Sequence, residues 1–585
     1  MGRAHPYRTA IPAEKQSAKR SGRSGGDGVA RLIDTPSNFH YTILTSNHQP
    51  AAGPMALISK ENHIGTVKSL GSSTIHIALD EDLFTMERTI NGKAYKVGQI
   101  GSFIMMPVGS VQIVGVINRV YQATELNREM EAQMIGSVSD GRFQKGIVVY
   151  PSLGGDVHMP DEEGVRSVFA SFSQYGFAVG DISGYAGERQ YVDPNKFFGK
   201  HIAILGSSGS GKSTTVASIL QKVQMFENTH VIILDIHNEY SAAFAEYGNL
   251  INITELEMPY WFMNFEEMRE MFVDENEDSA QSQIQMLKDL VLNAKKAKNP
   301  ELQSIITVDS PVFYDLNEVR AKFQFFDTER VSTSAGVREG PFFGQFTRFL
   351  VRLDSKMTDK RYEFMFRPRK FKDSNALKDI LNKLLGFDNK KQITVIDLSG
   401  VPFDIVNTIV ALLARTVFDF NFWNKSKADF PVLMLFEEAH NYLPQVATQY
   451  NRAARKIVER IAKEGRKYGV CCMIVSQRPS ELSETILSQC NNFVILRLTN
   501  PNDQNFVKKL VPDAFAGMFD VLPAMRQGEA LFVGDATALP SRVQLDFPQP
   551  PPNSSDILFY DKWVAADRPT DVGDVVNRWW KQERE

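Results

Sequence analysis

Gly206, Gly209, Gly211, Lys212 and Ser213 have the spacing of a loop that binds phosphate groups. They lie in the run Gly-Ser-Ser-Gly-Ser-Gly-Lys-Ser, which fits the pattern G-x-x-x-x-G-K-[ST]. In that pattern the backbone N–H groups cradle phosphates, the lysine meets the β- and γ-phosphates, and the serine hydroxyl ligates Mg²⁺. The sequence therefore predicts binding of a nucleoside triphosphate with magnesium. The alternative is a chance turn rich in glycine and serine.

The elements on either side of this loop are those that its mechanism requires. Residues 201–205 are apolar and predict a buried strand, and the chain from Thr214 onward predicts a helix. A helix N-terminus favours anions because its first N–H groups are unpaired. We expect ATP to contact the whole loop, which comprises Gly206, Ser207, Ser208, Gly209, Ser210, Gly211, Lys212, Ser213 and Thr214.

Glu437 and Glu438 end the apolar run 431–436 and predict the class of reaction. Hydrolysis of a triphosphate needs one carboxylate near the metal and a second that orients and deprotonates the attacking water. We assign Glu437 to the Mg²⁺ side and Glu438 to the general base. The alternative is an exposed acidic turn after a core strand. A kinase or a GTPase is disfavoured, since no guanine-specifying N-K-x-D motif is evident and Glu438 suits water better than a bound alcohol.

Three further residues are candidates for the same chemistry. Asp235 ends the apolar run 231–234, where sheets place ligand-binding residues, and either assists Mg²⁺ or caps the following turn. Gln477 follows another apolar run and either senses the γ-phosphate or is a plain surface residue. Arg466 ends a predicted helix and either stabilises the charge that develops during phosphoryl transfer in a neighbouring subunit or complements the helix dipole.

The order of elements along the chain predicts an α/β protein with a RecA-like P-loop ATPase core. Short β-branched runs at 73–78, 102–106, 111–120, 146–150 and 167–169 indicate a small β-barrel over residues 55–185. Strands and helices then alternate over 186–545 and indicate a parallel sheet covered by helices. A mainly helical insertion occupies about 255–390, including helices at 279–296 and 344–353. Residues 546–585, which begin with a proline-rich stretch, form a C-terminal tail.

Composition limits the class of protein and its setting. The 585 residues are 43% apolar and 23% charged, with a formal charge of −4, as in a core-forming protein of several domains. Residues 1–54 predict a disordered basic arm. The three cysteines have neither disulfide-framework nor zinc spacing, which favours the cytoplasm. The one stretch with the length and apolar content of a membrane span, 97–117, is interrupted by glycine and proline and predicts two strands joined by a turn.

Six segments together resemble the HerA family of hexameric DNA-translocating ATPases, relatives of FtsK in the RecA-like class. The resemblance covers most of the chain from about residue 65 to 545. The segments are K-H-I-A-I-L-G at 200–206, D-I-H-N-E-Y at 235–240, E-E-A-H at 437–440, E-G-R-K-Y-G at 464–469, S-Q-R-P-S at 476–480 and L-T-N-P at 498–501.

The resemblance implies a homohexamer that binds ATP between subunits, with Arg466 acting in trans, and double-stranded DNA in a central channel. It also implies that Lys200 helps to bind the nucleotide. Family members have arginine at that position, and lysine cannot make the same two-pronged phosphate contact. Glu437 stands where many relatives of the wider class have aspartate, so its reach towards magnesium is one methylene longer.

Two functions of different classes are compatible with this sequence. The first is an ATP-driven DNA translocase or helicase that acts with a partner nuclease or other effector in DNA end processing or antiviral defence. The second is a hexameric scaffold whose barrel ring docks and activates an effector, such as a nuclease or a sirtuin-type NADase, under the control of ATP. Arg452, Arg455 and Lys456 are candidates for DNA contact, although a solvated helix face explains them equally well.

Overall fold

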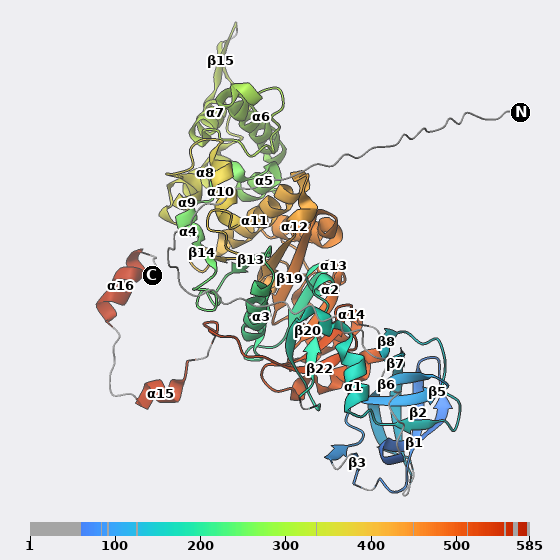
Figure 1. Ribbon diagram of the computed structural model, residues 1–585. Helices are drawn as coiled ribbons and strands as arrows, with labels where there is room; N and C mark the ends of the chain where they lie inside the picture. Colours follow the sequence, from blue (N-terminus) through green and yellow to red (C-terminus); the bar gives the residue numbers. More distant parts are fainter. Residues whose placement is uncertain are drawn as a thin grey trace, which may run out of the picture. The chain divides into compact units, whose positions relative to one another are not determined.

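The computed structural model describes residues 60–581 except for 84, 91–92, 124–126, 186, 335, 449, 512, 555–556 and 565–570. The basic arm expected over residues 1–54 lies outside the described residues. In the part that is described, the chain forms a barrel, a large mixed sheet, a cluster of helices and two short hairpins (Figure 1).

The barrel consists of six strands in the order β2-β1-β9-β5-β6-β7, and it is closed because β7 also pairs with β2. Alternate side chains point inward, so that Ile75 and Ile77 of β2 are fully buried with Ile113 and Ile117 of β6. A short strand, β8, extends the sheet beyond β7. The strands are β1 (His63–Leu70), β2 (Thr74–Leu79), β5 (Phe103–Val108), β6 (Val111–Gln122), β7 (Arg128–Ser139), β8 (Arg142–Lys145) and β9 (Asp156–His158).

Two strands expected from the sequence are absent from the described chain. Residues 146–150 form no strand, and Val148 is 86% exposed in the connection between β8 and β9. Residues 167–169 lie in helix α1 (Glu162–Phe169), which Asp161 caps by accepting a hydrogen bond from the N–H of Gly164. The reason is that β-branched residues form a strand only where a partner strand is available, and at 167–169 the cap at Asp161 starts a helix instead.

The large sheet has eleven strands in the order β11-β10-β22-β21-β20-β12-β19-β18-β13-β17-β14. From β20 to β14 all neighbours are parallel, and the remaining strands are antiparallel. The strands are β10 (Ala178–Ile182), β11 (Arg189–Tyr191), β12 (His201–Leu205), β13 (His230–Asp235), β14 (Asn249–Asn252), β17 (Ile393–Asp397), β18 (Val432–Phe436), β19 (Val470–Ser476), β20 (Cys490–Ile495), β21 (Glu529–Gly534) and β22 (Ser541–Leu545). The predicted α/β P-loop ATPase fold preceded by a barrel is confirmed.

Helices cover both faces of this sheet. Ile202 and Ile204 of β12 pack into the core that contains α3 (Lys212–Gln221). Ala203 and Leu205 enter the core of the other face, which contains α11 (Phe403–Trp423) and α12 (Arg452–Glu464). When helices cover both faces of a strand, every side chain of the strand is buried, so its sequence is a continuous apolar run, as in residues 201–205.

Helix α11 is the one helix of the described chain that is long and apolar enough to cross a membrane, over Ile405–Trp423. Burial in the core explains why α11 is so apolar. The side chains of Ile409, Val410, Leu412 and Leu413 are buried against the sheet. An apolar core helix of a globular fold has the same appearance.

The excursion between β14 and β17 is mainly helical, and its helices gather in one cluster (Figure 1). Trp261 and Phe346 are fully buried in it. It also carries an exposed hairpin of β15 (Arg330–Thr333) and β16 (Gly336–Glu339). The helices are α4 (Ile253–Leu256), α5 (Phe265–Phe272), α6 (Ala280–Lys298), α7 (Leu316–Thr328), α8 (Thr347–Thr358), α9 (Glu363–Phe366) and α10 (Ala376–Leu384).

The proline-rich stretch after β22 packs beside the P-loop helix α3. The N–H of Gln549 donates to the side chain of Gln221 at 2.8 Å, and Gln221 donates to the carbonyl of Pro550 at 2.8 Å. The N–H of Asn553 donates to the carbonyl of Glu239 at 2.7 Å. This stretch therefore fixes the loop after β13. Two exposed helices follow, α15 (Phe559–Val564) and α16 (Val572–Lys581).

Candidate active site

The sheet brings most of the predicted catalytic residues to one edge. The P-loop follows β12, Asp235 ends β13, the pair Glu437 and Glu438 follows β18, and Gln477 follows β19. These four strands are neighbours and parallel. Their carboxyl ends therefore lie side by side, where open α/β sheets bind ligands.

The P-loop has the backbone shape that phosphate binding requires. Gly209 and Gly211 have φ angles of +69° and +99°, which are strained for residues with a side chain. A Cβ atom at Gly206 would lie 2.6 Å from the Ser210 hydroxyl and 2.8 Å from Leu496. Helix α3 begins at Lys212, so its first N–H groups face the loop.

Glu438 faces the P-loop lysine. Its Oε1 lies 3.9 Å from the Nζ of Lys212, and its Oε2 lies 3.2 Å from the Nδ1 of His440. Glu438 has a φ angle of +46°, and backbone strain of this kind recurs at active sites. The Nδ1 of His440 also lies 3.3 Å from the hydroxyl of Ser476 at the end of β19. The carboxylate thus lies between Lys212 and a histidine that contacts the neighbouring strand β19.

Glu437 is fully enclosed. The hydroxyl of Tyr240 donates to its Oε2 at 2.5 Å, and the hydroxyl of Tyr442 donates to its carbonyl oxygen at 2.6 Å. Burial raises the pKa of Glu437 well above its usual value. A bound divalent cation would reverse this effect, because it stabilises the ionised carboxylate.

The carboxylate of Asp235 is turned towards the loop that follows β13. It accepts hydrogen bonds from the N–H groups of His237, Glu239 and Tyr240 at 3.2, 3.2 and 2.8 Å. Burial raises the pKa of Asp235 to about 6. This geometry is that of the turn cap that the sequence left open as an alternative.

Glu239 is a residue of the site that sequence reasoning missed. The hydroxyl of Ser213, the expected magnesium ligand, donates to its Oε2. Asp235 builds the loop, and the loop carries Glu239 to the P-loop serine. The signal was present in the D-I-H-N-E-Y segment, but an acid that follows a strand end by four residues has no fixed direction until the loop is folded.

Gln477 is half-buried at the end of β19, two strands from β13 and next to β12. The preceding Ser476 anchors the turn, because its hydroxyl accepts from the N–H of Arg478 at 3.0 Å. The L-T-N-P segment supports the P-loop from β20, since the hydroxyl of Thr499 lies 3.3 Å from that of Ser207.

Arg466 and Lys200 lie at the opposite edge of the sheet. Lys200 immediately precedes β12, and Arg466 lies four residues before β19. Five strand residues at about 3.3 Å each separate this edge from the P-loop by roughly 16 Å. The structure therefore does not bring either residue to the P-loop of its own chain.

The two cations differ in their surroundings. Lys200 forms an ion pair with Asp535 of the turn after β21. The guanidinium of Arg466 is exposed and has no hydrogen bond or ion pair among the described residues. It lies near His201, whose pKa is lowered to about 4, mainly by burial and partly by this positive charge.

The three residues expected to contact DNA are paired with acids. Arg452 lies 3.2 Å from Glu275, and the guanidinium of Arg455 donates to Glu459 at 2.7 Å. Lys456 donates to Glu266 at 2.5 Å. These pairs tie α12 to α5 and to itself, which matches the alternative of a solvated, ion-paired helix face.

Comparison with known proteins shows similarity to HerA helicases. Residues 177–417 match the family model described as "Helicase HerA, central domain". The chain is 28% identical over 509 residues to the DNA double-strand break repair helicase HerA of Sulfolobus acidocaldarius, covering 82% of this chain and 95% of the relative. The HerA of Pyrococcus furiosus is also 28% identical, over 63% of this chain and 69% of its own.

The chain is similar to HerA-family helicases over most of its length. It is an ATP-hydrolysing P-loop enzyme, as the loop after β12 and the acidic pair after β18 predict. The matched region begins at β10 and ends in α11, so it contains the P-loop, the 235–240 loop and the helical insertion.

The solved structures similar to this chain are more distant in sequence than these relatives. VirB4 of Thermoanaerobacter pseudethanolicus has a TM-score of 0.46 at 18% identity, covering 63% of this chain and 96% of VirB4. The plasmid coupling protein TrwB, solved with ADP and Mg²⁺, has a TM-score of 0.35 at 12% identity, covering 60% of this chain and 86% of TrwB.

Proposed function

We propose that this protein is an ATP- and Mg²⁺-dependent DNA translocase or helicase that works as a homohexameric ring in the cytoplasm. Relatives that match most of the chain are named DNA double-strand break repair helicases. The ring is proposed to enclose double-stranded DNA and to move it as ATP is hydrolysed at each junction between subunits.

The observation that carries this proposal is that the residues expected to act on the phosphates lie at two opposite edges of one sheet. Lys212, Ser213 and Glu438 lie at the carboxyl edge, whereas Arg466 and Lys200 lie at the amino edge. Phosphoryl transfer needs positive charge beside the γ-phosphate. The exposed guanidinium of Arg466 has no hydrogen-bond or ion-pair partner among the described residues, so it is free to contact a phosphate. A second copy that presents its amino edge to the P-loop would complete the site.

Each residue at the carboxyl edge of one chain has a proposed role in ATP hydrolysis. The P-loop N–H groups and Lys212 bind and orient the phosphates, and Glu438 takes a proton from the attacking water. His440 lies beside the second oxygen of Glu438, and the first oxygen faces Lys212. Gln477 follows Ser476, to which His440 is also bound, and is proposed to report the γ-phosphate to this network.

Glu239 joins Ser213 and Glu437 as a proposed residue of the magnesium site. No group of three or more His, Cys, Asp or Glu side chains forms a metal cage in the described chain. Magnesium in phosphoryl-transfer sites is held by one or two carboxylates together with substrate phosphates, so this arrangement of hydroxyl and carboxylates fits it. The bound ion would neutralise charge on the β- and γ-phosphates. Asp235 is proposed to position Glu239 through the loop rather than to bind the ion.

The test is ATP hydrolysis with and without duplex DNA. We expect DNA to stimulate hydrolysis by the wild-type protein, and both Lys212→Ala and Glu438→Gln to abolish the stimulated rate. Lys212→Ala should also weaken nucleotide binding, whereas Glu438→Gln should retain it. A wild-type rate that no DNA changes would contradict the proposal.

The second candidate function is an ATP-controlled scaffold for an effector protein, such as a nuclease or an NADase, in antiviral defence. It is favoured by exposed apolar side chains on the connection between β8 and β9 of the barrel: Val148, Val149, Tyr150 and Leu153. Effector activity that persists in Glu438→Gln, which should retain nucleotide binding, but is lost in Val148→Asp would support the scaffold. Loss in both would favour the motor.

A further inference from the structure

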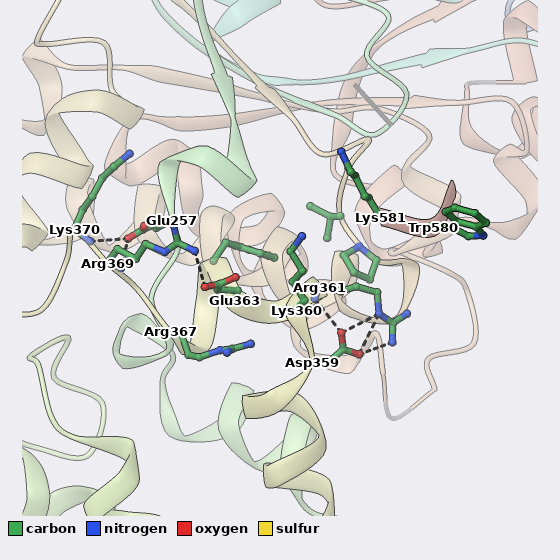
Figure 2. Close-up of a pocket in the computed structure, with 14 residues that line it drawn as sticks. Glu257, Asp359, Lys360, Arg361, Glu363, Arg367, Arg369, Lys370, Trp580 and Lys581 are labelled. Carbon is green, nitrogen blue, oxygen red and sulfur yellow. Dashed lines mark hydrogen bonds and ion pairs between the residues drawn. The ribbon is translucent and has the colours of Figure 1, made fainter. Parts of the chain in front are cut away.

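A strongly basic cavity lies between the helical insertion and the C-terminal helix α16 (Figure 2). Its volume is about 880 Å³. Six cationic and three acidic side chains line it, which leaves an excess of three positive charges. The cations are Lys360, Arg361, Arg367, Arg369, Lys370 and Lys581, and the acids are Glu257, Asp359 and Glu363.

The three acids are engaged with particular groups of the cavity wall. Asp359 accepts from the guanidinium of Arg361 at 2.6 Å, and Glu363 accepts from that of Arg369 at 2.7 Å (Figure 2). Glu257 accepts from the backbone N–H groups of Arg369 and Lys370 at 2.9 and 3.0 Å. The acids therefore orient the arginines and the segment that carries them, and the cavity as a whole stays positive.

The neighbouring cations also act on these acids. The pKa of Asp359 is lowered, mainly by its hydrogen bond from Arg361, and that of Glu363 by its hydrogen bond from Arg369. Arginine presents a planar fork that matches two phosphate oxygens, so a wall with three arginines suits a phosphodiester backbone.

An aromatic ring lies beside this charge. Trp580 of α16 lines the cavity and is 79% exposed. In the view of Figure 2, Trp580 and Lys581 lie on the side of Lys360 and Arg361, away from Arg369 and Lys370. Cationic groups together with an exposed aromatic ring are the means by which proteins hold single strands, because every base has a face that can stack.

Some of the residues that line the cavity follow a strand of the large sheet, which links the cavity to the nucleotide site. Gly400, Val401 and Pro402 line the cavity and follow β17 at the carboxyl edge of the large sheet. Strand β17 pairs with β13, whose last residue, Asp235, builds the loop that carries Glu239. A ligand in the cavity thus lies one strand away from an element that contacts the P-loop.

We propose that this cavity binds the backbone of single-stranded DNA, with a base stacked on Trp580. The inference rests on the proposed function as a DNA motor and adds to it a site for an unpaired strand. The three α12 cations expected to contact DNA are each paired with an acid and leave no excess charge, whereas the cavity has an excess of three positive charges.

The experiment measures binding of a fluorescent oligo-dT strand to the full-length protein by anisotropy over a series of salt concentrations. Removing two phosphate contacts with Arg367→Gln/Arg369→Gln should reduce the slope of log K against log salt by about 1.4 and weaken binding roughly twentyfold at 0.1 M salt. Trp580→Leu should weaken binding about fivefold or more with the slope unchanged. The matched control is Arg338→Gln/Arg348→Gln, which removes two exposed arginines of the insertion outside the cavity and should change neither value.

The outcomes separate this inference from the proposed function. If the wild-type protein binds oligo-dT and the cavity variants bind it equally well, the single-strand site is wrong and the motor stands. If the wild type binds no DNA of any form, both fail. An equal loss of affinity for a blunt duplex would overturn the assignment to a single strand. Particle mass and the thermal unfolding midpoint of each variant show that a loss of binding is not a loss of folding.

Discussion

Single residues define the chemical step at the carboxyl edge of the sheet. Glu438 is the proposed general base, and its carboxylate lies 3.9 Å from the Nζ of Lys212 and 3.2 Å from the Nδ1 of His440. Glu438→Gln keeps the shape of the side chain and removes its basicity. We expect ATP turnover to fall by about 10²–10⁴-fold, the usual contribution of a general base. Binding of a fluorescent ATP analogue should stay within a factor of two or three of wild type, and an active Glu438→Gln variant would refute the role.

The position of Glu239 beside Ser213 leads to a second prediction about a single residue. If it helps to hold magnesium beside Ser213, Glu239→Gln should raise the Mg²⁺ concentration for half-maximal ATPase activity by roughly tenfold, as loss of a supporting ligand does. The same shift should appear in Mg²⁺-dependent binding of a fluorescent ADP, which requires no turnover. Glu246→Gln, on the exposed part of the same connection, is the matched control and should leave both curves in place.

Elements are joined by a buried ion pair between the core and the insertion. The guanidinium of Arg415 in α11 donates to Glu267 in α5 at 2.8 and 3.1 Å and to the carbonyl of Phe262 at 2.6 Å. Arg415→Met leaves the Glu267 carboxylate buried and unpaired, so we expect a loss of about 3–5 kcal/mol in unfolding free energy, measured by urea. Arg320→Gln, which breaks the more exposed pair with Asp354, should cost at most about 1 kcal/mol.

Lys295 of α6 predicts a pH dependence for the insertion. Its ammonium is enclosed and donates to the carbonyls of Val308 and Ser310 at 2.6 and 2.8 Å, and burial lowers its pKa to about 7. From about pH 7 to the ordinary value of 10.5, the unfolded chain holds a proton that the folded chain lacks, so stability rises with pH.

The measurement is urea unfolding at several pH values between 7 and 10. The contribution of Lys295 should reach about 1.4 kcal/mol per pH unit. It is read as the difference in slope between the wild type and Lys295→Met, which has no proton to lose. Equal slopes for the two proteins would contradict the lowered pKa.

The whole molecule is predicted to be active only as an assembly. Arg466→Ala should reduce turnover by roughly 10³–10⁵-fold if its guanidinium acts on a neighbour's phosphate. Mixing Arg466→Ala with Glu438→Gln gives rings in which an intact Glu438 meets an intact Arg466 at some junctions. About a quarter of the wild-type rate should return, because half of the subunits supply each group at random. A mixture as inactive as its components, or a fully active Arg466→Ala monomer, would contradict catalysis between subunits.

Much of the core was predictable because its signals are local. Residues 201–213 combine a buried strand, left-handed glycines and a helix start, and each is legible without knowledge of the rest of the chain. The barrel was predicted as a class but not strand by strand. Strand β7 mixes acids with apolar residues, and the segment at 167–169 became helical through a cap at Asp161.

The sequence by itself determined that a phosphate loop and an acidic pair belong to one ATPase, because fixed spacings and apolar strands carry that information. It also predicted a strand-end glutamine and an arginine as further residues of the site. Only the tertiary structure decided that Asp235 holds its own loop while Glu239 reaches Ser213, and that Arg466 lies across the sheet from Lys212. The tertiary structure also brings together the segments near residues 257, 360, 400 and 580 that line the basic cavity. The physical reason is that strand order and side-chain direction depend on contacts between residues far apart in the chain, which no local pattern encodes.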